Sequence, residues 1–170
     1  GICAAENNNQ IGISGAFPNV KFIPLACSIG DLGLSSTATL QAKQYLIELK
    51  DRGYNIVVAN ASYGSNVYSQ SEYNGIQNLA NAGILLCTAS GNDGWDLDLE
   101  TDPNGSGLPN SGVDLNSNGN LEVSYPNSYN LPNIIGVASI LSNIQLALSS
   151  NYGQTEVDLA APGNFIFSTA

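Results

Sequence analysis

Four short apolar runs constrain the fold of this chain more than any other feature of its sequence. They occupy residues 21–25, 56–59, 84–88 and 134–138. Apolar residues follow one another in each run instead of alternating with polar ones, a pattern typical of strands that are buried on both faces. Such strands occur in parallel sheets that are covered by helices, so the runs predict buried parallel strands.

Two helical patterns separate the first three runs. Apolar residues recur at helical spacing over residues 37–52, where Ser35 or Ser36 can cap the start and a glycine follows the end. Between the second and third runs, Ser69 and Glu72 have the spacing of a capping box, and an apolar stripe continues until another glycine. This alternation predicts a doubly wound α/β sheet, in which binding sites lie at the carboxyl ends of the strands.

The charge balance excludes several classes of partner. The 170 residues carry 14 acidic side chains, 4 basic ones and no histidine, which gives a formal net charge of -10. Four basic groups cannot form the cationic surface that nucleic acids and anionic lipids require, and no apolar run is long enough to cross a membrane. We therefore expect neither nucleic acid nor membrane as a partner. Without histidine, these residues alone cannot complete a serine or cysteine protease triad.

Residues 93–122 differ in composition from the rest of the chain. Seven of the 14 acidic residues lie in this segment, with no Lys or Arg and with many Gly, Asn and Ser. Polar segments of this length without helical or strand periodicity are uncommon inside a domain. We interpret the segment as a polar, acidic insertion.

Two loops that follow predicted strands carry side chains suited to chemistry. In residues 88–94 (Thr-Ala-Ser-Gly-Asn-Asp-Gly), Asn92 could aim its NH2 donors at an incoming oxygen. An Asn-Asp-Gly turn, in which Asn92 bonds only its own backbone, is the alternative. Residues 60–65 (Asn-Ala-Ser-Tyr-Gly-Ser) could pair with an extended peptide or form an ordinary connection from strand to helix.

Several segments together resemble the subtilisin-like serine proteases, and residues 89–94, which are similar to the oxyanion loop of that family, are the most specific of them. The resemblance implies an α/β fold: a subtilisin-like doubly wound, mostly parallel sheet with helices on both faces. Residues 1–170 would be the central part of one peptidase domain, with the catalytic histidine just before Gly1 and the nucleophilic serine soon after Ala170. The similar segments are residues 1–13, 19–25, 60–64, 82–86, 89–94, 125–129, 133–138, 149–153 and 157–163.

The resemblance also implies roles for particular residues. Asn92 matches the asparagine that donates to the negative oxygen of the tetrahedral intermediate. Ser124 matches a residue near the base of the primary specificity pocket. Gly33 and Leu34 fall where the family usually has a Gly-Ser-Gly edge beside the substrate. Two groups of three complete the expected cleft for an extended polypeptide: Ser62, Tyr63 and Gly64, which would bond the substrate backbone, and Ala89, Ser90 and Gly91, which would form the opposite wall of the pocket.

Two loops resemble calcium sites. The first is similar to the family loop that binds calcium through one side-chain oxygen and two backbone carbonyls, although a simple polar turn is the alternative. The second has oxygen ligands at alternate positions, like the start of an EF-hand, but lacks the glutamate at position twelve and could equally be a solvated acidic loop. A structural calcium ion is therefore expected. The residues concerned are Asn9, Ile11 and Ile13 in the first loop and Asp114, Asn116 and Asn118 in the second.

The expected function is that of a serine endopeptidase that acts outside the cell or at its surface, with a propeptide as a further partner. Serine would attack the peptide carbonyl, histidine would relay the proton, aspartate would orient the histidine, and Asn92 would stabilise the oxyanion. These 170 residues alone are expected to be inactive. Two alternatives are a peptide-binding module without a triad and a calcium-stabilised surface module.

Overall fold

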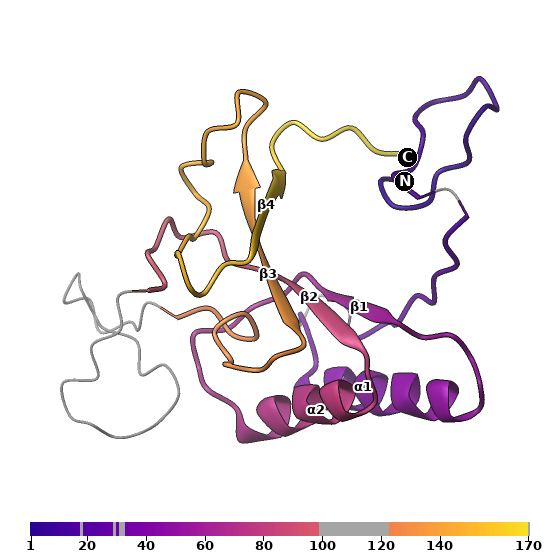
Figure 1. The fold of residues 1–170 in the computed structure, drawn as a ribbon, viewed down its shortest axis with the longest axis vertical. Helices are drawn as coiled ribbons and strands as arrows, with labels where there is room; N and C mark the ends of the chain where they lie inside the picture. Colours follow the sequence, from indigo (N-terminus) through magenta and orange to yellow (C-terminus); the bar gives the residue numbers. More distant parts are fainter. Residues whose placement is uncertain (18, 29, 31–32, 99–122, 170) are drawn as a thin grey trace.

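Four parallel strands form a sheet at the centre of the molecule (Figure 1). The computed structural model describes residues 1–17, 19–28, 30, 33–98 and 123–169. The strands are β1 (Val58–Ala61), β2 (Leu85–Ala89), β3 (Ile134–Ile140) and β4 (Leu159–Pro162). Each strand pairs with the next one along the chain, in the order β1-β2-β3-β4. The predicted parallel sheet is thus confirmed.

Two helices, α1 (Ser36–Asp51) and α2 (Gln70–Asn81), lie side by side on one face of the sheet (Figure 1). Ser35 caps α1, because its Oγ accepts the Ala38 N–H at 3.2 Å. Ser69 caps α2 in the same way, through the Glu72 N–H at 3.3 Å. The α/β fold is confirmed, and within the described residues both helices cover the same face. No helix in that part of the chain is long and apolar enough to cross a bilayer.

The strand predicted at residues 21–25 is absent, and this prediction was wrong. The segment is extended but does not pair with any other described strand. Phe22 and Ile23 are exposed, and Pro24 has no N–H to donate to a neighbour. An apolar run marks burial only when a partner strand is present. The fourth strand is β4, in a segment that the apolar pattern did not mark.

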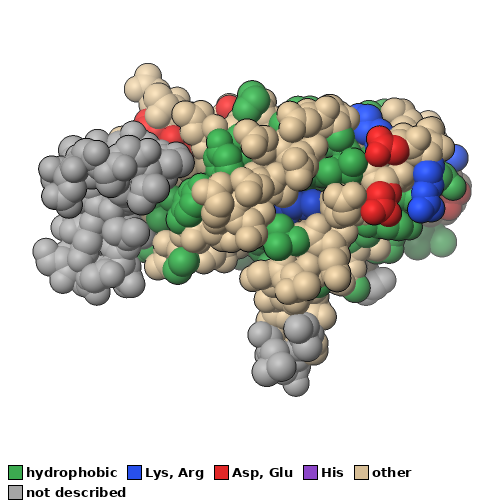
Figure 2. Space-filling model, turned by 90° about the horizontal axis from the view of Figure 1, so that it is seen from below, with side chains coloured by type: hydrophobic (Ala, Val, Ile, Leu, Met, Phe, Trp, Pro, Cys, Tyr) green, Lys and Arg blue, Asp and Glu red, His purple; other side chains and the backbone are tan. Residues whose placement is uncertain are grey.

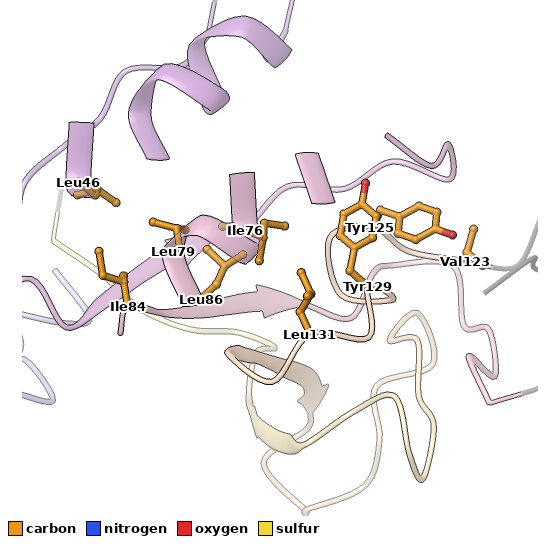
Figure 3. Close-up of a cluster of buried hydrophobic side chains, with 10 residues drawn as sticks. Leu46, Ile76, Leu79, Ile84, Leu86, Val123, Tyr125, Tyr129 and Leu131 are labelled. Carbon is orange, nitrogen blue, oxygen red and sulfur yellow. The ribbon is translucent and has the colours of Figure 1, made fainter. Parts of the chain in front are cut away.

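The hydrophobic core lies between the helices and the first two strands (Figure 3). Ile76 and Leu79 of α2 and Ile84 just before β2 are fully buried there. Burial of each such side chain contributes roughly 1.5–3 kcal/mol. The rings of Tyr125 and Tyr129 extend the core toward residue 123, stacked with their centroids 4.4 Å apart. The core therefore fixes both β2 and the segment that follows residue 122.

Figure 2 shows the face that carries the helices. Hydrophobic side chains, uncharged polar side chains and backbone cover most of it, and the Lys and Arg side chains at the right of the view lie beside acidic ones. Of the predicted insertion at residues 93–122, the structure describes only residues 93–98. The prediction of one domain interrupted by an insertion therefore stays a prediction.

Candidate functional site

A cavity of about 430 Å³ opens at the carboxyl ends of β1 and β2. The two strands are parallel neighbours, with Ala61 opposite Thr88, so the segments that follow them emerge at the same edge of the sheet. This edge is where the sequence predicted the site. The lining residues are Ser62, Tyr63, Gly64, Ser65, Asn66, Ala89, Gly91, Asn92, Asp93, Trp95, Val123 and Ser124.

The cavity collects seven of the ten predicted cleft residues. Ser124 is one of them and is itself buried. Ser90 is not in the lining: it is 1% exposed and lies beneath the cavity, where its Oγ donates to the Asn151 carbonyl at 2.9 Å. Gly33 and Leu34 are also outside the lining, and Leu34 instead forms an isolated bridge with Ser28. Their assignment to an outer edge of the substrate cleft stays a prediction.

An antiparallel bridge frames one side of the cavity. The Ser65 N–H donates to the Tyr125 carbonyl at 2.9 Å, and the Tyr125 N–H donates to the Ser65 carbonyl at 2.8 Å. These two bonds join the loop after β1 to the segment that begins at residue 123. On this side, main-chain hydrogen bonds therefore form the border of the cleft.

Asn92 is exposed at the rim of the cavity. Gly91 and Gly94 stand on either side of it with φ values of +115° and +71°, a region of backbone conformation that favours glycine. Within the described residues, no hydrogen bond joins the Asn92 carboxamide to the backbone or to another side chain, so the predicted alternative of a self-bonded turn finds no support. Both donors of the Asn92 amide are available to a ligand in the cavity.

The hydroxyl of Tyr63 is hydrogen-bonded to a largely buried ion pair. Lys43 Nζ lies 2.8 Å from Glu72 Oε1, and the Tyr63 hydroxyl donates to the same carboxylate oxygen at 2.8 Å. Lys43 Nζ also donates to the Tyr63 oxygen at 2.9 Å. Burial raises the pKa of the Tyr63 phenol, and the negative charge of Glu72 raises it further. The phenol therefore stays neutral and fixes the ring at the wall of the cavity.

Comparison with known proteins places this arrangement in a family. A protein-family model described as the subtilase family matches residues 1–170. The chain belongs to the subtilase family.

This subtilase chain is similar to named serine proteases over nearly all of its length. It is 31% identical over 169 residues to thermitase of Thermoactinomyces vulgaris, covering 99% of the chain and 49% of that protein. It is 29% identical over 170 residues to thermophilic serine proteinase of Bacillus sp. (strain AK1), covering 99% of the chain and 34% of that protein. The chain thus spans half or less of the length of these relatives.

Solved structures agree with the fold of the subtilase chain. A protease from Pseudoalteromonas arctica PAMC 21717 superposes with a TM-score of 0.70 at 25% identity, covering 96% of this chain and 42% of that one. A structure described as S41 psychrophilic protease superposes with a TM-score of 0.71 at 21% identity, covering 96% and 50% respectively. The second likeness shows the fold alone.

Three residues important to this subtilase site were missed by the sequence analysis. Lys43 lies on the buried side of α1, with Thr39, Leu46 and Leu49. A lysine on a buried stripe, with a glutamate in the next helix, was a signal that could have identified the pair Lys43 and Glu72. Asn151 follows no such pattern, because its partners lie about 60 residues away in the sequence.

The predicted calcium loop, at Asn9, Ile11 and Ile13, is distant in sequence from the residues that line the cleft and is mostly exposed. Asn9 Oδ1 accepts the Ile11 N–H at 3.0 Å, which closes a polar turn. Asn7 Oδ1 is buried without a hydrogen-bond partner, and such an oxygen fits a hard cation. The described residues contain no group of three or more His, Cys, Asp and Glu side chains that could hold a metal ion. Asp114, Asn116 and Asn118 lie outside the described residues.

Proposed function

We propose that the full-length protein is a serine endopeptidase of the subtilisin type, and that this chain supplies its oxyanion donor and much of its substrate cleft. The observation that carries the proposal is the free carboxamide of Asn92, exposed at the rim of the cavity between two loops of the sheet. A fixed donor at that rim stabilises negative charge that develops on a carbonyl oxygen during attack. Membership of the subtilase family supports the same chemistry.

In this mechanism the attacking serine, the histidine base and the orienting aspartate come from other parts of the protein. Histidine takes the proton from serine as the serine oxygen adds to the peptide carbonyl, and later gives it to the leaving amine. Asn92 binds the oxyanion of the tetrahedral intermediate more tightly than the neutral carbonyl, because its N–H dipole meets a full negative charge. It therefore lowers the barrier without holding the substrate more tightly.

The proposed substrate is an extended polypeptide that lies along residues 62–64. The main chains of Tyr63 and Gly64 make no hydrogen bond to another described residue, so their N–H and C=O groups are available to a strand. Ala89 and Gly91 across the cavity add little bulk, which leaves room for a large apolar side chain. A propeptide could occupy the same groove before activation, and we expect the mature enzyme to act outside the cell or at its surface.

Reaction with a fluorophosphonate probe tests this function. The full-length protein is expected to react covalently and to hydrolyse casein, because an activated serine is needed for both. Pretreatment with an unlabelled serine-protease inhibitor should remove both signals, and residues 1–170 alone should show neither. A full-length protein that binds peptides but neither reacts nor cleaves would contradict the proposal and favour a binding module without a triad.

We also propose that residues 7–13 bind a structural calcium ion, with Asn7 and Asn9 as side-chain ligands and backbone carbonyls near Ile11 and Ile13. The support is the buried, unpartnered oxygen of Asn7. Calcium at about 100 times its dissociation constant would stabilise the folded state by roughly 2.7 kcal/mol. Calcium should therefore raise the melting temperature of the full-length protein relative to a chelator, and Asn7→Ala should reduce this shift. Gln10→Ala, at an exposed side chain of the same loop, is the control, and an unchanged shift in Asn7→Ala would exclude this site.

A further inference from the structure

Asn151 lies directly beneath the loop that carries Asn92. It belongs to the connection between β3 and β4 and is 0% exposed. A buried carboxamide needs partners for its oxygen and its NH2 group, since an unsatisfied polar group in the interior costs about 1–3 kcal/mol. The partners of Asn151 therefore show what its side chain does.

All the partners of the Asn151 carboxamide are main-chain groups on the two sides of Asn92. Asn151 Oδ1 accepts the N–H of Asp93 at 2.9 Å and the N–H of Trp95 at 3.1 Å. Its Nδ2 donates to the carbonyl of Ser90 at 3.0 Å. The Asn151 carboxamide thus makes hydrogen bonds to the main chain before and after Asn92, and none to Asn92 itself.

The main chain of Asn151 adds two hydrogen bonds to the same loop. The Asn151 N–H donates to the Gly91 carbonyl at 3.1 Å, and the Asn151 carbonyl accepts the Ser90 hydroxyl. A Cβ on Gly91 would collide with the Asn151 amide nitrogen, so the loop can lie flat on Asn151 only with glycine there. The main chain from residue 90 to residue 95 is therefore docked on one buried side chain.

The direction of the Asn92 side chain depends on this docking. Because Asn92 makes no side-chain hydrogen bond of its own in the described part of the molecule, its orientation follows from the backbone at residues 91–93. An oxyanion donor must meet the developing charge at 2.7–3.1 Å, and small displacements weaken that contact. A residue that fixes this backbone consequently controls how well Asn92 can act.

We propose that Asn151 is a positioning residue for catalysis, which aims Asn92 at the oxyanion by holding residues 90–95; this role rests on the proposed endopeptidase function. Only a carboxamide has the required acceptor and donor on one short planar group. Leucine has a similar shape but offers neither. The substitution Asn151→Leu therefore removes the three hydrogen bonds of the carboxamide with little change in side-chain volume.

A double-mutant cycle in the full-length enzyme tests the role. Asn151→Leu should lower kcat at least tenfold, with KM changed less than threefold, in protein whose active sites are counted with the fluorophosphonate probe. Asn151→Leu added to Asn92→Ala should cause less than a threefold further loss, because the donor that Asn151 positions is already gone. A role in overall folding would instead give the same loss in both backgrounds.

Asn133→Leu provides the matched control. Asn133 is also buried, and its Nδ2 donates to the carbonyls of Ile76 and Ile84, away from the cleft. This variant should lose stability but keep its kcat per active site. If Asn151→Leu does not fold, Asn151→Asp takes its place, since an ionised aspartate keeps the shape but presents an oxygen instead of a donor to the Ser90 carbonyl.

The outcomes separate this role from the function on which it rests. A wild-type protein that neither reacts with the probe nor cleaves peptides overturns both proposals. Wild-type turnover with unchanged kcat in the Asn151 variant, or with equal losses in the two backgrounds, overturns only the role of Asn151. A kcat loss that vanishes when Asn92 is alanine supports it.

Discussion

Asn92→Ala in the full-length enzyme is expected to lower kcat roughly 100- to 1,000-fold and to leave KM nearly unchanged, a magnitude taken over from the corresponding donor of subtilisin rather than from this structure. Under the proposed mechanism, the Asn92 amide would meet a full negative charge only after the serine has attacked. In the bound substrate it would face a neutral carbonyl, to which it would add little affinity. Steady-state kinetics on a peptide anilide measure the two constants.

Two comparisons make the Asn92 experiment decisive. Asn74→Ala removes another exposed carboxamide, on α2, and should leave both constants at the wild-type level. The melting temperature of Asn92→Ala should match the wild type, because the exposed Asn92 side chain bonds nothing else among the described residues. Full turnover in the Asn92 variant would remove its assigned role, whatever happens at other positions of the cleft.

Lys43→Met is expected to destabilise the full-length protein by about 3 kcal/mol, because it leaves the carboxylate of Glu72 buried without its counter-charge. The side chains of Lys43 and Glu72 are 7% and 13% exposed, so water replaces the missing partner only in small part. The Tyr63 hydroxyl also loses one of its contacts. The midpoint of urea unfolding, measured on inhibitor-blocked enzyme to prevent autolysis, reports the loss.

The same substitution elsewhere on α1 serves as the control for Lys43. Lys50→Met removes only a bond from Lys50 Nζ to the Gly83 carbonyl in an exposed setting, and should change stability by about 1 kcal/mol or less. The triple variant Lys43→Met/Tyr63→Phe/Glu72→Leu should regain most of the stability lost in Lys43→Met, because no polar partner is left stranded. Equal losses in the Lys43 and Lys50 variants would show that the ion pair has no special weight.

The sheet and both helices could be predicted because their signals are local. The apolar runs that became β1, β2 and β3 and the serine caps of α1 and α2 each lie within one short stretch of sequence. Residues 21–25 show the limit of this reasoning, since an apolar run does not reveal whether a partner strand lies beside it. The weak apolar pattern of β4 likewise gave no local signal, although all four of its residues pair with residues of β3.

The position of Asn92 could be predicted from chain order, since parallel strands bring their carboxyl ends to one edge. The residues that support it could not, because the hydrogen bonds of Asn151 and the ion pair of Lys43 join segments far apart in the sequence. Ser90 shows a subtler difference. It lies next to cleft residues in the sequence, but its side chain is buried beneath the cavity. Its hydroxyl donates to the Asn151 carbonyl and so helps to hold the loop that carries Asn92.

The bridge between Ser65 and Tyr125 affects how this cleft could change over evolution. Its two hydrogen bonds use main-chain atoms only, so substitutions of the exposed Ser65 need not alter the framework that they form, whereas the Tyr125 ring is part of the core. Under the proposed function, side chains along the rim could then change to suit different peptides while this border of the cleft keeps its shape. A scaffold of this kind separates the choice of bound peptide from the maintenance of shape.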